Sequence, residues 1–316
     1  MTAAPPSRKL GTTLLVVSGL MALGAAALVS RRFLALGPRA PGPTVAALAP
    51  PSAAAPARSE EALFQVTAAT GTVEAQRGGL WLPIKKGDTL TRSDVVRTAA
   101  GGRAVLSLSA GTEIELRERV EIELDRLAKG ATVDLRRGKV VARVSGNEGL
   151  AITSRDTRTA NEGPAHFVVL SDERGRVSVA ALSGKATFTA GGKSLTLPEG
   201  TQSSSEAGAA PSDPERIPEE VLLEVVWPAA EQRHGVAETE VQGRAAPSSV
   251  VTVNGARATV GADGHFTATV PLKTGKNAVD VAAEDLSGRT RQSSATLVRH
   301  GAPPALTPES TDLWKK

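Results

Sequence analysis

The sequence predicts an all-β protein, with a transmembrane helix near the N-terminus followed by two all-β domains. Three observations support this class. Apolar and polar residues alternate with period two through most of the chain, and Gly or Pro interrupts the alternation at roughly 8–12-residue intervals. Outside one apolar run, no window shows the 3.6-residue stripe of an amphipathic helix. The first domain fits a sandwich or a short solenoid of many short strands, and the second fits a sandwich.

The N-terminal element is the apolar run at 10–30, which carries no charge. As a helix it would span ~31 Å, close to the ~30 Å hydrocarbon core of a bilayer. Arg8 and Lys9 precede it, and Arg31 and Arg32 follow it. We therefore expect a transmembrane anchor behind a cytoplasmic head of residues 1–9. The alternative is a signal peptide cleaved at the small residues Ala25-Ala26-Ala27.

Residues 31–59 form the next predicted element, a linker rich in Pro and Ala that would act as an extended spacer. Because the short head cannot fold by itself, we expect all function to lie beyond the anchor. The sequence thus predicts a single-pass protein of the bacterial inner membrane with its C-terminal bulk in the periplasm. A cleaved, freely periplasmic form is the alternative.

Composition excludes several function classes. The chain has no Cys, so it has no disulfide, thiolate metal site or Cys nucleophile, and its four His are scattered. The net charge is 37 − 33 = +4, but residues 1–58 hold six basic residues and no acidic one, which leaves 31 − 33 = −2 for the remainder. This near-neutral remainder lacks the basic face that nucleic-acid binding needs. We expect no nucleic-acid partner, no metal and no cofactor.

The first domain is predicted at 60–202. Its alternating runs include 104–109, 112–116, 120–125, 132–136, 140–144, 167–170, 177–182 and 193–197. Breaks between strands are expected at glycines, among them Gly101-Gly102, Gly111, Gly130, Gly138, Gly175 and Gly184.

Motif residues in this domain resemble the FecR domain family. The matching stretches are Gly71-Thr72-Val73, Trp81, Gly87-Asp88, Asp94-Val95-Val96-Arg97-Thr98, Gly102-Arg103-Ala104, Gly111-Thr112, Leu135-x-x-Gly138-x-Val140 and Gly200-Thr201. The candidate family-motif positions are Trp81, Gly87, Asp88, Asp94, Thr98, Gly102 and Gly111, for which we expect structural roles at turns and bends. One departure is Pro164, which removes a backbone donor, so we expect that strand to begin later or to lie on an edge.

The second domain is predicted at 219–300, after a Ser/Ala/Pro-rich linker at 203–218 and before a tail at 301–316. Asn254-Gly255 is the strongest hairpin signal in the chain. With Asp263-Gly264-x-Phe266 and Gly275-x-Asn277-x-Val279 it resembles the bacterial Ig-like modules called glucodextranase domain B-like. This resemblance implies a fold and no particular activity.

One group of residues resembles a chemical site, namely Glu113, Glu115, Glu118, Glu121, Glu123 and Asp125. Carboxylates in pairs can bind Ca²⁺ or perform acid–base chemistry. However, they alternate with apolar residues and are interleaved with Arg117, Arg119 and Arg126, which favours a solvated strand face. No nucleophile elbow, phosphate loop or zinc-protease motif occurs. We therefore expect no enzyme and no catalytic residue.

The resemblance implies transmembrane signalling, in which a FecR-like domain senses another envelope protein. We expect a binding or regulatory module with an envelope protein as its partner. Since we expect a head of only nine residues, which could not regulate a sigma factor alone, we expect either that the chain signals through a membrane partner or that its FecR-like domain serves another envelope task. The alternative is a structural envelope protein that binds a glycan such as peptidoglycan.

Overall fold

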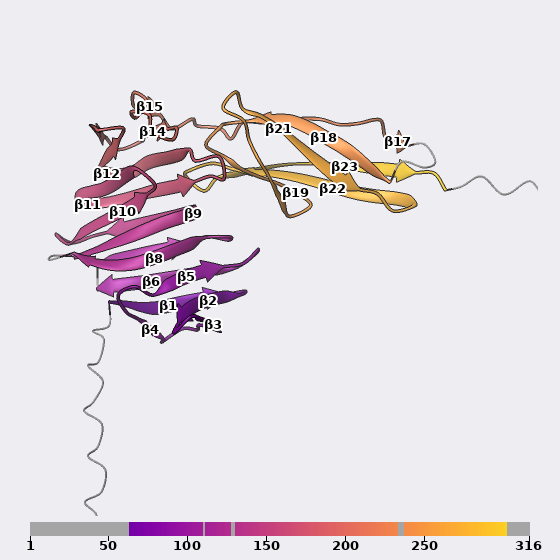
Figure 1. Cartoon of the computed structure of the whole chain (residues 1–316). Helices are drawn as coiled ribbons and strands as arrows, with labels where there is room; N and C mark the ends of the chain where they lie inside the picture. Colours follow the sequence, from indigo (N-terminus) through magenta and orange to yellow (C-terminus); the bar gives the residue numbers. More distant parts are fainter. Residues whose placement is uncertain (1–62, 110, 128–129, 233–236, 302–316) are drawn as a thin grey trace, which may run out of the picture. The chain divides into compact units, whose positions relative to one another are not determined.

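The computed structural model describes residues 63–109, 111–127, 130–232 and 237–301 (Figure 1). Every regular element in these ranges is a strand, which confirms the all-β class. No helix among the described residues is long and apolar enough to cross a membrane. The predicted head, anchor and linker at 1–59 lie outside the described residues, as do residues 302–316 of the predicted tail.

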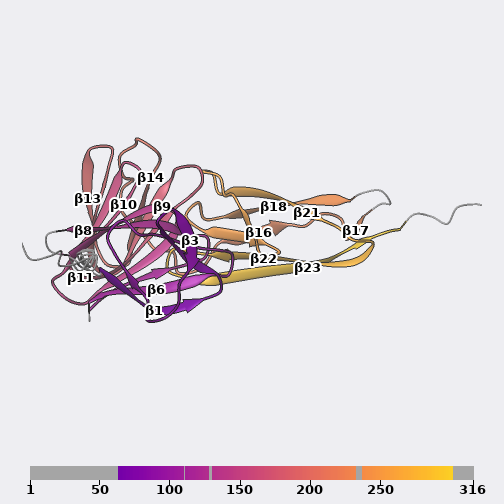
Figure 2. The same cartoon turned by 60° about the horizontal axis from the view of Figure 1, so that its bottom comes forward.

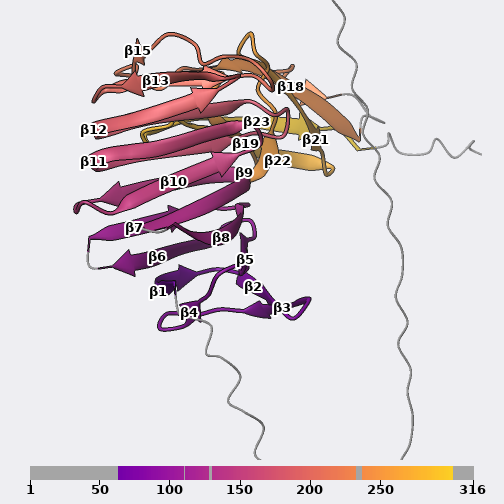
Figure 3. The ribbon, with the colours of Figure 1, turned by 60° about the vertical axis from the view of Figure 1, so that its left-hand side comes forward.

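The first domain is one 15-stranded sheet. Its strands are β1 (Phe64–Thr70), β2 (Val73–Arg77), β3 (Leu80–Pro83), β4 (Thr89–Leu90), β5 (Val95–Thr98), β6 (Arg103–Ser109), β7 (Thr112–Leu116), β8 (Glu121–Leu127), β9 (Gly130–Val144), β10 (Gly149–Ser154), β11 (Thr157–Ser171), β12 (Val177–Ala190), β13 (Lys193–Leu197), β14 (Thr201–Ser205) and β15 (Glu215–Arg216). Figure 3 shows them stacked side by side, with β1 to β4 at one end and β13 to β15 at the other.

This sheet folds over itself into two layers. The first halves of β9 and β11 and the second half of β12 join a ladder that runs β3-β2-β5-β8-β9-β10-β11-β12-β13. Their other halves join a second ladder, β4-β1-β6-β7-β9-β11-β12-β14-β15. Apolar side chains from both ladders share one core, in which Phe64, Phe167 and Phe188 are fully buried. Because nearly all of these core residues lie in strands of the two ladders, the ladders form the two walls of the core.

Glycines let the long strands pass from one layer to the other. Gly138 in β9, Gly163 in β11 and Gly184 in β12 have φ of +96°, +75° and +68°, a region that side chains with a Cβ rarely adopt. The sequence predicted breaks at Gly138 and Gly184, and that prediction is wrong in detail. The strands bend there and continue, because a single left-handed residue redirects the backbone while pairing resumes on both sides.

Pro164 lies inside β11, which is a central strand and not an edge. The expectation of a later start or an edge position is therefore wrong. The pairing of β11 with β12 is interrupted between Asn161 and Ala165, at the bend itself. Pro164 has no backbone N–H to donate, and at this bend no hydrogen bond to β12 calls for one.

The segment expected to be a linker at 203–218 contributes to the sheet. Ser203–Ser205 complete β14, which pairs with β12, and β15 pairs with β14. Serine hydroxyls hold the connection, since Ser203 donates to the Ser212 carbonyl at 2.7 Å and Ser205 donates to that of Ala209 at 2.7 Å.

The second domain contains two sheets, which Figure 2 shows as separate layers. The strands are β16 (Leu223–Val226), β17 (Glu231–Gln232), β18 (Glu238–Ala245), β19 (Val250–Val253), β20 (Ala256–Ala258), β21 (His265–Pro271), β22 (Gly275–Glu284) and β23 (Thr290–Arg299), in the orders β16-β18-β21 and β17-β23-β22-β19-β20. Asn254 and Gly255 have φ of +49° and +76° and connect β19 to β20, as the hairpin prediction requires. A second core, which includes Val241, Phe266 and Val281, fills the space between the sheets.

A third apolar cluster joins the two domains. Val141, Val168 and Ala180 lie on the outer face of the second ladder of the first domain, where solvent exposure would be expected for a sandwich. Leu286 from the second domain packs onto them and is only 1% exposed. These middle strands are therefore buried on both faces, which explains their nearly continuous apolar sequence.

Candidate functional site

Of the predicted motif positions, Trp81 shows the most distinctive contact. It lies in β3, and the Arg97 guanidinium from β5 stacks on its ring at 3.9 Å from the centroid. The same guanidinium donates from Nε to Glu74 Oε2 at 2.8 Å. The indole face is thus covered by an intramolecular cation–π contact and is not a free platform for a ligand.

Gly87 and Asp88 form the turn before β4. Gly87 has φ of +96° and donates its N–H to the Val66 carbonyl at 2.8 Å. The Asp88 carboxylate accepts the N–H of Lys85 at 2.9 Å. Both residues fix the path of the backbone.

Asp94 and Thr98 are buried acceptors of backbone bonds. Asp94 Oδ2 accepts the Thr91 N–H at 2.8 Å. Thr98 Oγ1 donates to the Arg117 carbonyl at 2.6 Å and accepts the Val120 N–H at 2.9 Å. Thr98 therefore holds the bend between β7 and β8, where Arg119 takes a positive φ.

Gly102 and Gly111 lie where another segment passes closely. A Cβ on Gly102 would approach the Thr72 carbonyl oxygen to 2.6 Å, and a Cβ on Gly111 would approach Ser145 Oγ to 2.7 Å. The structure does not bring the seven motif positions together. Gly102, Gly111 and Asp94 line three different cavities.

The acidic cluster divides into two parts. Glu121 and Glu123 lie on the outer side of β8 and pair with Arg136, at 2.9 and 2.8 Å. No group of three or more potential metal ligands occurs among the described residues. The solvated-face interpretation fits these two carboxylates but is wrong for Glu115, which is 4% exposed.

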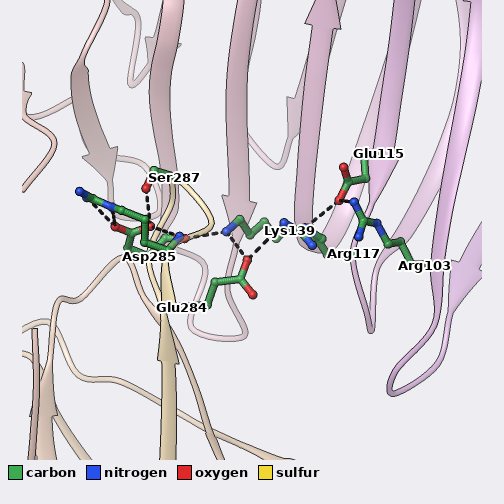
Figure 4. Close-up of polar contacts among 8 residues, drawn as sticks. Arg103, Glu115, Arg117, Lys139, Glu284, Asp285 and Ser287 are labelled. Atoms are coloured by element: carbon green, nitrogen blue, oxygen red, sulfur yellow. Dashed lines mark hydrogen bonds and ion pairs between the residues drawn. The ribbon is translucent and has the colours of Figure 1, made fainter. Parts of the chain in front are cut away.

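Glu115 belongs to an ionic cluster at the junction of the two domains, which Figure 4 shows, and its own side chain is buried there. Its Oε1 lies 2.8 Å from Arg103 Nη2 and 2.9 Å from Arg117 Nε. These two guanidiniums compensate the carboxylate, which explains why it can be buried on a strand face predicted to be solvated.

Lys139 is the second buried charge of this junction cluster, and the sequence did not single it out. Its Nζ donates to Glu284 Oε1 at 2.8 Å and to the Asp285 carbonyl at 2.6 Å (Figure 4). The Lys139 side chain from β9 thus binds the C-terminal end of β22. Arg117 Nη2 lies 3.7 Å from the same Glu284 oxygen. The only local signal is a lysine next to Val140-Val141, in a run that is apolar on both faces.

Burial opposes the charged form of both Lys139 and Asp285, and their hydrogen-bond partners favour it. Burial lowers the pKa of Lys139, and the attraction of Glu284 only partly opposes it. For Asp285, burial raises the pKa, but hydrogen bonds from Ser287 and Arg289 outweigh it and hold the pKa below its usual value. The Asp285 carboxylate therefore remains charged and fixes the loop that carries Leu286.

A cavity of about 210 Å³ lies beside this cluster, lined by Arg103, Arg117, Lys139, Glu118, Arg257 and Glu284, among others. Within this lining Glu284 pairs with Lys139 and Arg117, and the lining has no Ser, His or Cys. Such a lining can bind or transmit force between domains, but it offers no nucleophile.

Comparison with known proteins agrees with both sequence resemblances. Residues 94–187 match the family model described as FecR protein, and residues 224–300 match the model described as glucodextranase, domain B. The FecR and Ig-like identifications from the sequence are thereby confirmed. No curated protein matches the chain.

Solved structures give distant likenesses. A Parabacteroides distasonis protein, provisionally named an anti-sigma factor, is 14% identical at a TM-score of 0.35. The match covers 39% of this chain and 59% of that one, so this chain spans little more than half of that protein. The fibronectin(III)-like modules of Clostridium thermocellum CbhA are 10% identical at a TM-score of 0.22, with 57% and 94% covered. At these scores neither likeness carries an argument about this chain.

Proposed function

We propose that the chain is a non-enzymatic binding and regulatory module of the bacterial envelope, anchored in the inner membrane, which recognises a partner protein in the periplasm through its first domain. The observation that carries the proposal is the FecR match at 94–187, which runs from the start of β5 into β12. FecR-like domains suggest signalling by contact with another envelope protein.

The site chemistry is consistent with binding and not with catalysis. Buried charges of the junction cluster are satisfied by one another, as in Lys139 with Glu284. The two domains share an apolar cluster, so a structural change caused by a partner at one domain can be transmitted to the other through this cluster.

The glycan-binding alternative receives little support from the aromatic residues. Sugar-binding faces use exposed aromatic rings, whereas Arg97 covers Trp81, Phe266 is 3% exposed and Trp227 packs against the second core.

The test is lysine-directed crosslinking of the full chain in intact cells, followed by mass spectrometry of the captured species and of the N-terminus. We expect one envelope protein attached to lysines of the first domain, such as Lys85 or Lys185, and an uncleaved N-terminus. A mature start near Leu28 with only peptidoglycan-linked species would overturn the proposal. Capture confined to Lys273 and Lys276 would move recognition to the second domain.

A further inference from the structure

The outer edge of β3 is open. β3 pairs with β2 alone among the described strands, so its second edge has no ladder partner. The other strands that end the two ladders are β4 and β15, which have two residues each, and β13, which begins with exposed Lys193 and Ser194. Among these end strands of the first domain, β3 is longer than β4 and β15, and unlike β13 it carries no Lys within the strand itself.

The backbone of β3 can accept such a strand at Trp81. Ile84 donates its N–H to the Val73 carbonyl at 3.0 Å, so Ile84 and the residues two and four before it direct their backbone groups toward β2. The intervening Trp81 therefore directs its N–H and C=O outward, and Pro83 directs its C=O outward. An added strand can form about three backbone hydrogen bonds here.

Two leucines add apolar surface next to this edge. Leu80 is 68% exposed and Leu82 is 45% exposed, and they are two of the four large exposed apolar residues in the described part of the chain. They share the face of the hairpin that carries buried Ala75, opposite Leu82, so they extend the core face beyond its last buried residue. A partner strand that covers them would bury this surface.

Charge identifies the kind of strand that fits. Two of the three carboxylates near the edge are paired with cations, Glu74 with Arg97 and Asp94 with Arg77, while Asp88 accepts the Lys85 N–H and keeps its charge. Lys85 and Lys86, just beyond β3, are exposed and form no ion pair with any described residue. This excess of free cations disfavours a second copy of the same edge and favours an acidic partner.

We propose that β3 is the docking edge for an extended segment of the partner protein, whose apolar side chains alternate with carboxylates. The segment pairs with the Trp81 backbone, covers Leu80 and Leu82, and places its acidic residues near Lys85 and Lys86. This inference rests on the proposed function and specifies its site.

The test places the photocrosslinking residue p-benzoylphenylalanine at Leu80 or Leu82 in the full chain in intact cells. The control carries it at Val226, which is 67% exposed and lies in the second domain. We expect capture from 80 and 82, but not from 226, of one protein through an alternating apolar and acidic segment. Capture of another copy, of residues before Leu63 or of nothing would overturn the inference. Capture from 226 alone would overturn it while leaving a binding function in place.

A synthetic peptide of the captured segment then tests the geometry. Leu80→Asp or the pair Lys85→Glu and Lys86→Glu should weaken its binding roughly tenfold or more, with an unchanged unfolding midpoint because these side chains are exposed. Two peptides are compared, one N-methylated at the odd-numbered residues and one at the even-numbered residues. Only the methylation of the N–H groups that face β3 should abolish binding, because alternate N–H groups of a strand point to opposite edges. Equal effects of both sets would exclude strand pairing.

Discussion

Single glycines determine where the first domain changes layer. Gly184 has φ of +68°, and a Cβ there would lie 2.3 Å from the Pro164 carbonyl oxygen. We expect Gly184→Ala to lower the free energy of unfolding by roughly 3 kcal/mol, because backbone strain and a backbone clash add. Gly192 is the matched control, with φ of +75° and open space around its Cβ position. Gly192→Ala should cost only about 1 kcal/mol in urea unfolding. Equal losses would mean that the layer bend is not tightly packed.

A second residue-scale prediction concerns His166. Burial and then the charge of Arg143 lower its pKa below the usual 6.5. Below pH 6.5 the unfolded chain therefore takes up a proton before the folded chain does, so the free energy of unfolding should fall as the pH falls from 6.5 toward the folded pKa. Denaturation at a series of pH values measures this slope. His166→Gln should remove it, and Arg143→Met should reduce it. A slope unchanged by both substitutions would contradict the assignment.

At the scale of elements, Lys139 connects β9 to the end of β22. Its side chain is 4% exposed, whereas that of Glu284 is 29% exposed. Glu284→Gln leaves a buried ammonium without its anion and should lower the free energy of unfolding by roughly 3 kcal/mol. Lys139→Met removes the buried charge, and Glu284 keeps Arg117 nearby, so the loss should be smaller.

The double variant Lys139→Met with Glu284→Gln completes this cycle. It should be more stable than Glu284→Gln alone, because no unpaired buried charge remains. Additive losses in the double variant would show that the two groups do not interact in solution.

The strands and turns of both domains could be predicted because their causes are local. Asn254-Gly255 predicts its hairpin from two residues, and alternation places Ile114 and Leu116 in the core. Gly138 shows the limit of local evidence, since the same residue can end a strand or bend it. Here the strand bends, because β9 finds pairing partners on both sides of Gly138, and Val120, within 2.8 Å of a Cβ at that position, leaves no room for a side chain.

The junction could not be predicted because its causes are distant in the chain. Val141 and Val168 are apolar on the outer face, but Leu286, which covers them, lies more than a hundred residues later and outside their domain. Glu115 likewise follows the period of a solvated face, and only Arg103 and Arg117, brought together by pairing, explain its burial. Contacts between the domains leave no periodic pattern in either one.

At the scale of the whole molecule, Leu286 should couple the unfolding of the two domains. Leu286→Asp places a carboxylate among Val141, Val168 and Ala180 and should weaken the junction by about 3 kcal/mol or more. With Trp314 replaced by Phe, Trp81 and Trp227 remain, one in each domain, so fluorescence of variants that retain only one of these two tryptophans follows each domain separately. We expect coincident transitions in the native chain and separate ones after Leu286→Asp. Val226→Asp, at a 67% exposed site, should leave them coincident. Transitions that already differ in the native chain would show that the junction does not couple the domains, and a signal received at β3 would then stay within the first domain.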